Sequence, residues 1–167
     1  MDQVLQKLET TLLEFYTAPI DANRRSELEA QLQYFQESPE ACSTAQAFLS
    51  LPTESTSPYL KHFSGSVLEK LLTSEGRVSS EEATQTATSL CNLVVERFEA
   101  LNCFPRYVLT KMVQVCVLAG AQVETMDGAF LGGLTGLGKT AMGSNGNIEG
   151  PLLLICSAIE HYAEAAG

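Results

Sequence analysis

Proline-marked breaks divide the sequence into amphipathic stretches, and this division constrains the fold more than any other feature. The first stretch, from about Asp2 to Tyr16, repeats its apolar side chains every three to four positions, which is the spacing of one helix face. Pro19 ends this stretch, and Asp21 is the predicted N-cap of a second helix that runs to about Gln36. The pattern predicts short helices joined by tight turns.

A serine followed by a proline occurs twice, each time where a helix would begin. Ser38 and Pro39 predict a third helix that starts at once and runs to about Leu51, because proline is favoured in the first turn of a helix. Ser57 and Pro58 give the same signal for a fourth helix. The first part of the chain therefore predicts two pairs of helices.

The second half of the chain carries further helix signals. Ser79 and Glu82 have the spacing of a capping box, which predicts a long helix to about Leu101. The next helix, over residues 107–119, is apolar on most sides, as expected of a helix packed between neighbours. We expect Gly120 to end that helix as its C-cap.

A glycine-diluted helix over 123–137, a flexible loop over 138–150 and a last helix from Pro151 complete the pattern. The sum is eight helices in four antiparallel pairs of about 35 to 45 residues each, the period of HEAT-type repeats. We therefore expect an all-α fold, an α-solenoid of about four HEAT-like pairs. The first two pairs occupy residues 1–72 and the last two occupy 79–167. A four-helix bundle is the alternative architecture.

Composition and charge restrict the classes of partner. A hydrophobic content of 45% with 18% charged residues is typical of a folded chain. The net charge of −10 argues against nucleic acid or an anionic membrane as partner and suits a basic protein. The five cysteines are scattered through apolar runs, so we expect buried thiols rather than a disulfide framework. Without a signal peptide or a long apolar run, the chain should be soluble and intracellular.

One motif suggests nucleotide chemistry. Residues 133–140 satisfy the P-loop pattern, in which the glycine backbone holds phosphate, the lysine reaches it and the hydroxyl binds magnesium. The residues in those positions are Gly133, Gly138, Lys139 and Thr140. The flanking residues resemble neither the buried strand nor the helix that a P-loop requires, so we interpret the motif as a chance match and expect no cofactor.

No other set of residues predicts catalysis or metal binding. His62 and His161 are far apart, and neither has a nucleophile placed to form a triad. Cys91 and Cys116 lie on apolar helix faces and are expected in the core. We therefore predict a protein without catalytic residues or a metal site.

Several blocks of the sequence resemble a known family. They are Leu12–Tyr16, Asn23–Glu29, Phe35–Ala41, Ser57–Tyr59 and Leu68–Leu71, with fainter matches in Phe104–Val113 and Gly150–Leu153. In order and spacing they resemble the N-terminal repeats of importin-β-family nuclear transport receptors, and among these the exportins. The resemblance is strongest over residues 1–72 and moderate over 104–120.

The resemblance implies a function in protein export from the nucleus, with shuttling between nucleus and cytoplasm. In the family, inner helices of these repeats bind Ran in its GTP form; here they would be 21–37, 58–72, 105–119 and 151–165. The candidate contacts are polar positions on the second and third of these helices: Lys61, Ser64, Glu69, Arg106, Thr110, Lys111 and Gln114. Nuclear pore proteins and protein cargo, actin–profilin in one branch of the exportins, are the further partners implied.

Receptors of this family have roughly twenty repeats. We therefore expect the chain to be a fragment, with cargo binding weak or missing. The alternative functions are a generic helical-repeat scaffold with other partners and, less favoured, a P-loop nucleotide-binding protein.

Overall fold

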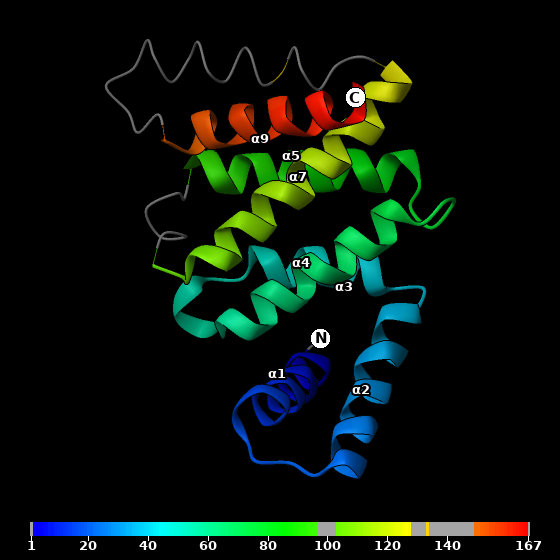
Figure 1. The fold of residues 1–167 in the computed structure, drawn as a ribbon, viewed down its shortest axis with the longest axis vertical. Helices are drawn as coiled ribbons and strands as arrows, with labels where there is room; N and C mark the ends of the chain where they lie inside the picture. The colour runs from blue at the N-terminus through cyan, green and yellow to red at the C-terminus, as the bar shows by residue number, and fades with distance from the viewer. Residues whose placement is uncertain (1, 97–102, 128–132, 134–148, 167) are drawn as a thin grey trace.

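The computed structural model describes residues 2–96, 103–127, 133 and 149–166, and within these ranges the regular elements are all helices. Figure 1 shows their arrangement. The elements are α1 (Asp2–Thr17), α2 (Ala22–Glu37), α3 (Ala41–Ser50), the 3₁₀ turn η1 (Thr53–Ser55), α4 (Pro58–Thr73), α5 (Ser80–Glu96), α7 (Arg106–Asp127) and α9 (Glu149–Ala166). None of the helices in the described ranges is long and apolar enough to cross a membrane.

Three of the predicted helix starts are confirmed by their capping bonds. The side chains of Asp21 and Ser57 each accept a hydrogen bond from the backbone N–H three residues later, at 2.8 and 3.2 Å. Ser79 and Glu82 form the predicted capping box: the Glu82 N–H donates to Ser79 Oγ at 3.2 Å, and the Ser79 N–H donates to Glu82 Oε2 at 2.9 Å. These bonds satisfy N–H groups that have no partner inside the helix.

The predicted start of the third helix is wrong by two residues. Ser38 is the C-cap of α2, and its N–H donates to the Phe35 carbonyl at 3.1 Å. Its backbone is extended, the conformation that a following proline favours, so Pro39 lies in the turn rather than in the first turn of a helix. Helix α3 begins at Ala41 instead.

Gly120 does not end its helix as predicted. Helix α7 continues through it to Asp127, and Val123 beyond it is buried. A glycine inside a helix costs about 1 kcal/mol relative to alanine, a cost that burial of a valine side chain can offset. The predicted separate helix over 123–137 is therefore, as far as Asp127, the end of α7; its remainder and the predicted loop fall outside the described residues except at Gly133, Glu149 and Gly150.

The helices are arranged in layers along the long axis of the molecule (Figure 1). Helices α3 and α4 pack together in the middle, α5 and α7 pack together on top of them, and α9 lies on α7 and α5. Between these layers α3 contacts α5 and α4 contacts α7, an order that is compatible with a helical-repeat arrangement. A single buried cluster runs through the layers and includes Phe48, Leu68, Met112 and Leu154.

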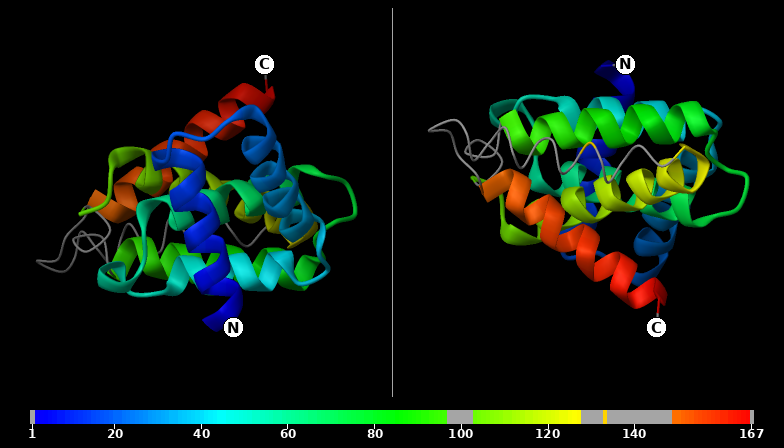
Figure 2. Two further views of the ribbon diagram at one scale, coloured as in Figure 1. Left: turned by 90° about the horizontal axis from the view of Figure 1, so that it is seen from below. Right: turned by 90° about the horizontal axis from the view of Figure 1, so that it is seen from above.

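The first helix pair departs from that order. Helix α1 packs on α4, and Figure 2 shows it lying across the direction of α3 and α5. Its Glu9 carboxylate accepts a hydrogen bond from the Ser57 N–H at 3.0 Å, at the start of α4 where the helix dipole favours a negative charge. Helix α2 contacts α1 and α3, and its Phe35 ring lies 6.0 Å from the ring of Phe63 on α4.

A buried lysine joins α3 to α4. The Lys61 side chain is fully buried, and its ammonium group donates to the carbonyl oxygens of Phe48, Leu49 and Leu51 at 2.9, 2.7 and 2.6 Å. Carbonyl groups at the end of a helix have no partner within it and carry partial negative charge. The ammonium group supplies three donors to that end, so all three of its N–H groups are paired.

Replacing Lys61 should destabilise the fold. In Lys61→Met, the carbonyl groups of Phe48, Leu49 and Leu51 lose the ammonium donor, and in the described part of the chain only Phe48 keeps another, the Leu51 N–H at 3.3 Å. We expect the free energy of unfolding to fall by about 2 to 4 kcal/mol. Urea denaturation followed by circular dichroism measures this loss. The control is Lys70→Met, since Lys70 is exposed on the same helix and its removal should leave the midpoint almost unchanged. Equal stability of the two variants would contradict this assignment.

Candidate functional site

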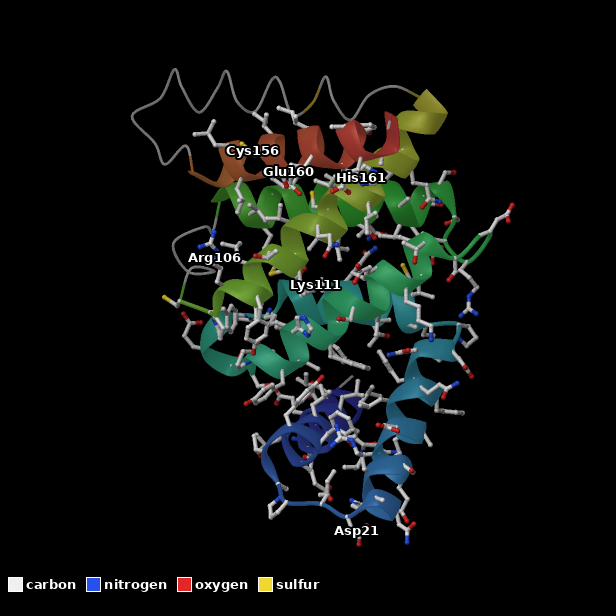
Figure 3. All side chains as sticks on the ribbon, in the orientation of Figure 1. Asp21, Arg106, Lys111, Cys156, Glu160 and His161 are labelled. Carbon is white, nitrogen blue, oxygen red and sulfur yellow. The ribbon has the colours of Figure 1, made fainter. Side chains whose placement is uncertain are left out.

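Four ring side chains from three helices gather on one side of the molecule. They are Tyr16 on α1, Tyr59 and His62 on α4, and Tyr107 on α7, and we call them the aromatic surface. Tyr16 is 54% exposed and Tyr107 is 44% exposed, although both are in ring-to-ring contact with a neighbour. Figure 3 shows the start of α7 here, marked by Arg106. Partly exposed tyrosines held by one another form a surface that another molecule can contact.

The rings of the aromatic surface are held in two close pairs. The Tyr16 and Tyr59 rings are stacked, with centroids 5.1 Å apart and planes 9° apart. His62 and Tyr107 meet edge to face, with centroids 5.2 Å apart and planes at 77°. Both distances lie in the range of favourable aromatic pairs. The pKa of Tyr107 is raised by burial of its phenol and by the nearby hydroxyls of Tyr59 and Tyr16, which links the two pairs.

A half-buried ion pair borders the aromatic surface. Lys111 on α7 donates to the Glu69 carboxylate on α4, and Figure 3 shows Lys111 where α7 crosses α4. The aliphatic part of the lysine lies against Gly65, where an added Cβ would be 2.6 Å from Lys111 Cγ. A side chain at this position would displace Lys111, so Gly65 permits the close approach of the two helices.

A second charged group holds α1 to α2 beside the surface. The Arg24 guanidinium donates to both Glu14 oxygens, from Nε at 2.6 Å and from Nη2 at 2.8 Å. This hydrogen bonding lowers the pKa of Glu14. The Arg25 guanidinium carbon lies 4.7 Å from the centroid of the Phe15 ring, which in turn meets Tyr16 edge to face. The two arginines thus help fix the end of α1 that carries Tyr16.

The structure divides the seven predicted Ran contacts into three groups. Lys61 and Ser64 are fully buried, so their assignment to non-core positions is wrong and neither can meet a partner at the surface. Glu69 and Lys111 are brought together as an ion pair, which their types and helical spacing do not reveal. The exposed predicted residues are Arg106, Thr110 and Gln114, all on α7.

Ser64 is buried although it lies outside the one apolar stripe that the sequence of α4 shows. Helix α4 packs against α1, α3 and α7 at once, so it is buried on more than one face. Its second buried face consists of small or polar residues between α4 and its neighbours: Lys61, Ser64 and Gly65. Ser64 Oγ has no hydrogen-bond partner within the described part of the chain.

The tyrosines of the aromatic surface were not predicted as site residues. Tyr16, Tyr59 and Tyr107 each stand near the end of a helix, where the sequence shows an apolar or polar position but not its neighbours in space. The one feature of the sequence that could have indicated the aromatic surface is that three of its five tyrosines stand near predicted helix ends. This feature does not predict which helix ends lie next to one another in the fold.

Other parts of the structure offer less. An open pocket of about 740 Å³ is lined by Val123 of α7 and by polar residues of α5: Ser80, Glu81, Thr84, Gln85, Thr88 and Ser89. The described residues contain no group of three or more metal-ligating side chains. Of the P-loop pattern, Gly133 is exposed, whereas Gly138, Lys139 and Thr140 lie outside the described residues. The residues up to Asp127 are helical rather than the strand that a P-loop follows.

Comparison with protein-family models, curated proteins and solved structures gave no significant match for this chain. The candidate site therefore depends on its own geometry.

The pKa of His62 is expected to make stability depend on pH. Burial lowers this pKa from 6.5, the charge of Lys111 lowers it further, and Glu69 opposes them. The unfolded chain then binds a proton that the folded chain does not, so stability should be complete above about pH 6.5 and decrease as pH falls below it. Urea midpoints at pH 7.5 and 5.5 should differ less in His62→Gln than in the unchanged protein.

The matched control for this measurement is His161→Gln, which removes the other histidine on α9 and leaves His62 in place. Its pH dependence should remain that of the unchanged protein. A His62→Gln variant with the same loss of stability at pH 5.5 would contradict the role of His62.

Proposed function

We propose that this chain is a protein-binding module without catalytic chemistry, and that its partner docks on the aromatic surface. The observation that carries the proposal is the exposure of Tyr16 and Tyr107 while both rings are fixed by neighbours. Tyrosine supplies a large contact area together with a hydroxyl group, and it is enriched among residues that dominate binding energy. Rings already held in place lose little conformational freedom on binding.

We further propose that the helices form a short array of HEAT-like pairs. The contacts of α3 with α5 and of α4 with α7 are those of two consecutive helix pairs in a solenoid, and they support that assignment for residues 41–127. The packing of α1 across α4 differs from such an array, and it brings Tyr16 beside Tyr59.

We propose Ran in its GTP form as the partner, in an exportin-like role in nuclear protein export. Two observations support this choice. The helices α4 and α7, which correspond to inner helices in the resemblance to exportins, both contribute to the aromatic surface. The net charge of −10 favours a partner with a basic surface. Exportin-6 is the family member that the resemblance favours; pore proteins and cargo such as actin–profilin would belong to the same role.

A helical scaffold with an unrelated protein partner is the second candidate. The arrangement of α1 favours it, because an end pair that lies across the array presents a surface unlike that of a regular repeat stack. Both candidates use the aromatic surface, so they differ in the identity of the partner and not in the site.

Binding to Ran should depend on its nucleotide and on the exposed tyrosines. We expect calorimetric titration to detect the GTP-loaded form and not the GDP-loaded form. Tyr16→Ala and Tyr107→Ala should each weaken binding about tenfold or more, as for aromatic residues at the centre of an interface. Tyr34→Ala is the matched control, because Tyr34 is 80% exposed on α2 and should not affect affinity.

The outcomes separate the partner from the surface. Equal binding to both nucleotide forms, or to neither, would exclude the exportin-like role. Selective binding that Tyr34→Ala weakens as much as Tyr107→Ala would instead exclude the aromatic surface as the docking site.

A further inference from the structure

We propose that Cys91 and Cys116 are an oxidisable dithiol, a modification site at which hydrogen peroxide forms a disulfide between α5 and α7. The two sulfur atoms are 2.7 Å apart, and both residues are buried. The pair connects α5 and α7, which pack against each other in the layer above α3 and α4. Both cysteines were expected in the core, but their positions in the sequence do not predict that they pair.

The distance between the sulfurs is the observation that carries the proposal. Nonbonded carbon atoms rest about 3.5 to 4.0 Å apart, and sulfur is the larger atom, so 2.7 Å is closer than packing of two thiols requires. A disulfide bond measures about 2.05 Å. The sulfurs therefore need to approach by only about 0.7 Å for a bond to form.

The surroundings of the pair distinguish the two thiols. The Cys116 S–H also reaches the Ala87 carbonyl, one turn before Cys91 on α5, at 3.6 Å. The pKa of Cys91 is lowered by the hydrogen bond from Cys116, whereas the pKa of Cys116 is raised. Cys91 is also 7% exposed and Cys116 is 0% exposed. Both differences make Cys91 the thiol that meets a small oxidant first.

The reaction proceeds in two steps that balance. The Cys91 thiolate attacks one oxygen of hydrogen peroxide, the O–O bond breaks, and a sulfenic acid and hydroxide form. The Cys116 sulfur then attacks the Cys91 sulfur, the S–S bond forms and the S–O bond breaks. The departing hydroxide takes the Cys116 proton, and the hydroxide of the first step takes the proton that Cys91 lost on forming its thiolate. In total, two thiols and one peroxide give one disulfide and two waters.

Peroxide treatment of the folded protein should link these two cysteines and no others. The background carries Cys103→Ser and Cys156→Ser, because these two thiols are exposed and would form bonds between molecules. After treatment, the intact monomer should lose about 2 Da, the mass of two hydrogen atoms. Peptide mapping should find Cys91 joined to Cys116, and a thiol reductant should reverse the change.

Cys42 is the internal control for burial. It is 5% exposed, similar to Cys91, but its sulfur lies beside the Gln46 amide rather than another thiol. It should therefore stay reduced and remain open to alkylation after unfolding.

A second variant tests the order of the steps without requiring the disulfide. In Cys116→Ala, Cys91 has no partner and should stop at the sulfenic acid, which a dimedone probe captures. Folding of this variant is checked by its helical circular dichroism. Alkylation of both Cys91 and Cys116 as free thiols after peroxide treatment of the parent protein would overturn the proposal. So would a loss of 2 Da that maps to Cys42.

Discussion

The ammonium group of Lys61 is the interaction on which the rest of the structure depends. Its three hydrogen bonds to the end of α3 fix α3 against α4, and those two helices form the middle layer on which α1, α2, α5 and α7 are placed. A charge is costly to bury unless its donors are paired, and here each donor has a carbonyl acceptor. The geometry of α4 is therefore strictly determined near its start, where Tyr59 and His62 also stand.

The fixed start of α4 explains how the aromatic surface is assembled. Glu9, in the middle of α1, accepts a hydrogen bond from the Ser57 N–H and holds α1 against the start of α4. The stacked rings of Tyr16 and Tyr59 place the end of α1 beside the first turn of α4. Gly65 lets α7 approach α4, and the Lys111–Glu69 pair closes that contact. Tyrosines from three helices consequently meet although they are distant in the sequence. The same close packing of the second half of the molecule brings the sulfurs of Cys91 and Cys116 together.

Local signals in the sequence predicted where helices form, but not how the helices pack against one another. Asp21, Ser57 and Ser79 act through bonds to residues three positions away, so their effect can be read from the sequence alone. The start of the third helix was predicted wrongly because the Ser38 side chain is of a type that caps helices, whereas the following proline favours the extended backbone that Ser38 has. The helix end at Gly120 was predicted wrongly because burial of residues beyond a glycine can stabilise further helical turns, and Val123 is buried. These errors concern boundaries, which tertiary packing adjusts.

The candidate site was predicted less completely, and the reason is physical. Residue type suggested that Lys61 faces solvent, but a lysine whose ammonium reaches three carbonyl groups can be buried. Tyr16 and Tyr59 are neighbours only because α1 crosses α4, an arrangement that the spacing of apolar residues within α1 does not encode. Three of the polar positions chosen on α7, Arg106, Thr110 and Gln114, are exposed, because they lie on the side of the helix away from its buried residues.

Hydrogen–deuterium exchange of the chain with and without GTP-loaded Ran tests the central claim most directly, because it locates a docking surface without any mutation. The account predicts slower exchange in peptides that cover the end of α1, the first turns of α4 and the start of α7. Exchange in the middle of α2, around Tyr34, should not change. Protection confined to α2 or α9, or equal protection by the GDP-loaded form, would contradict it.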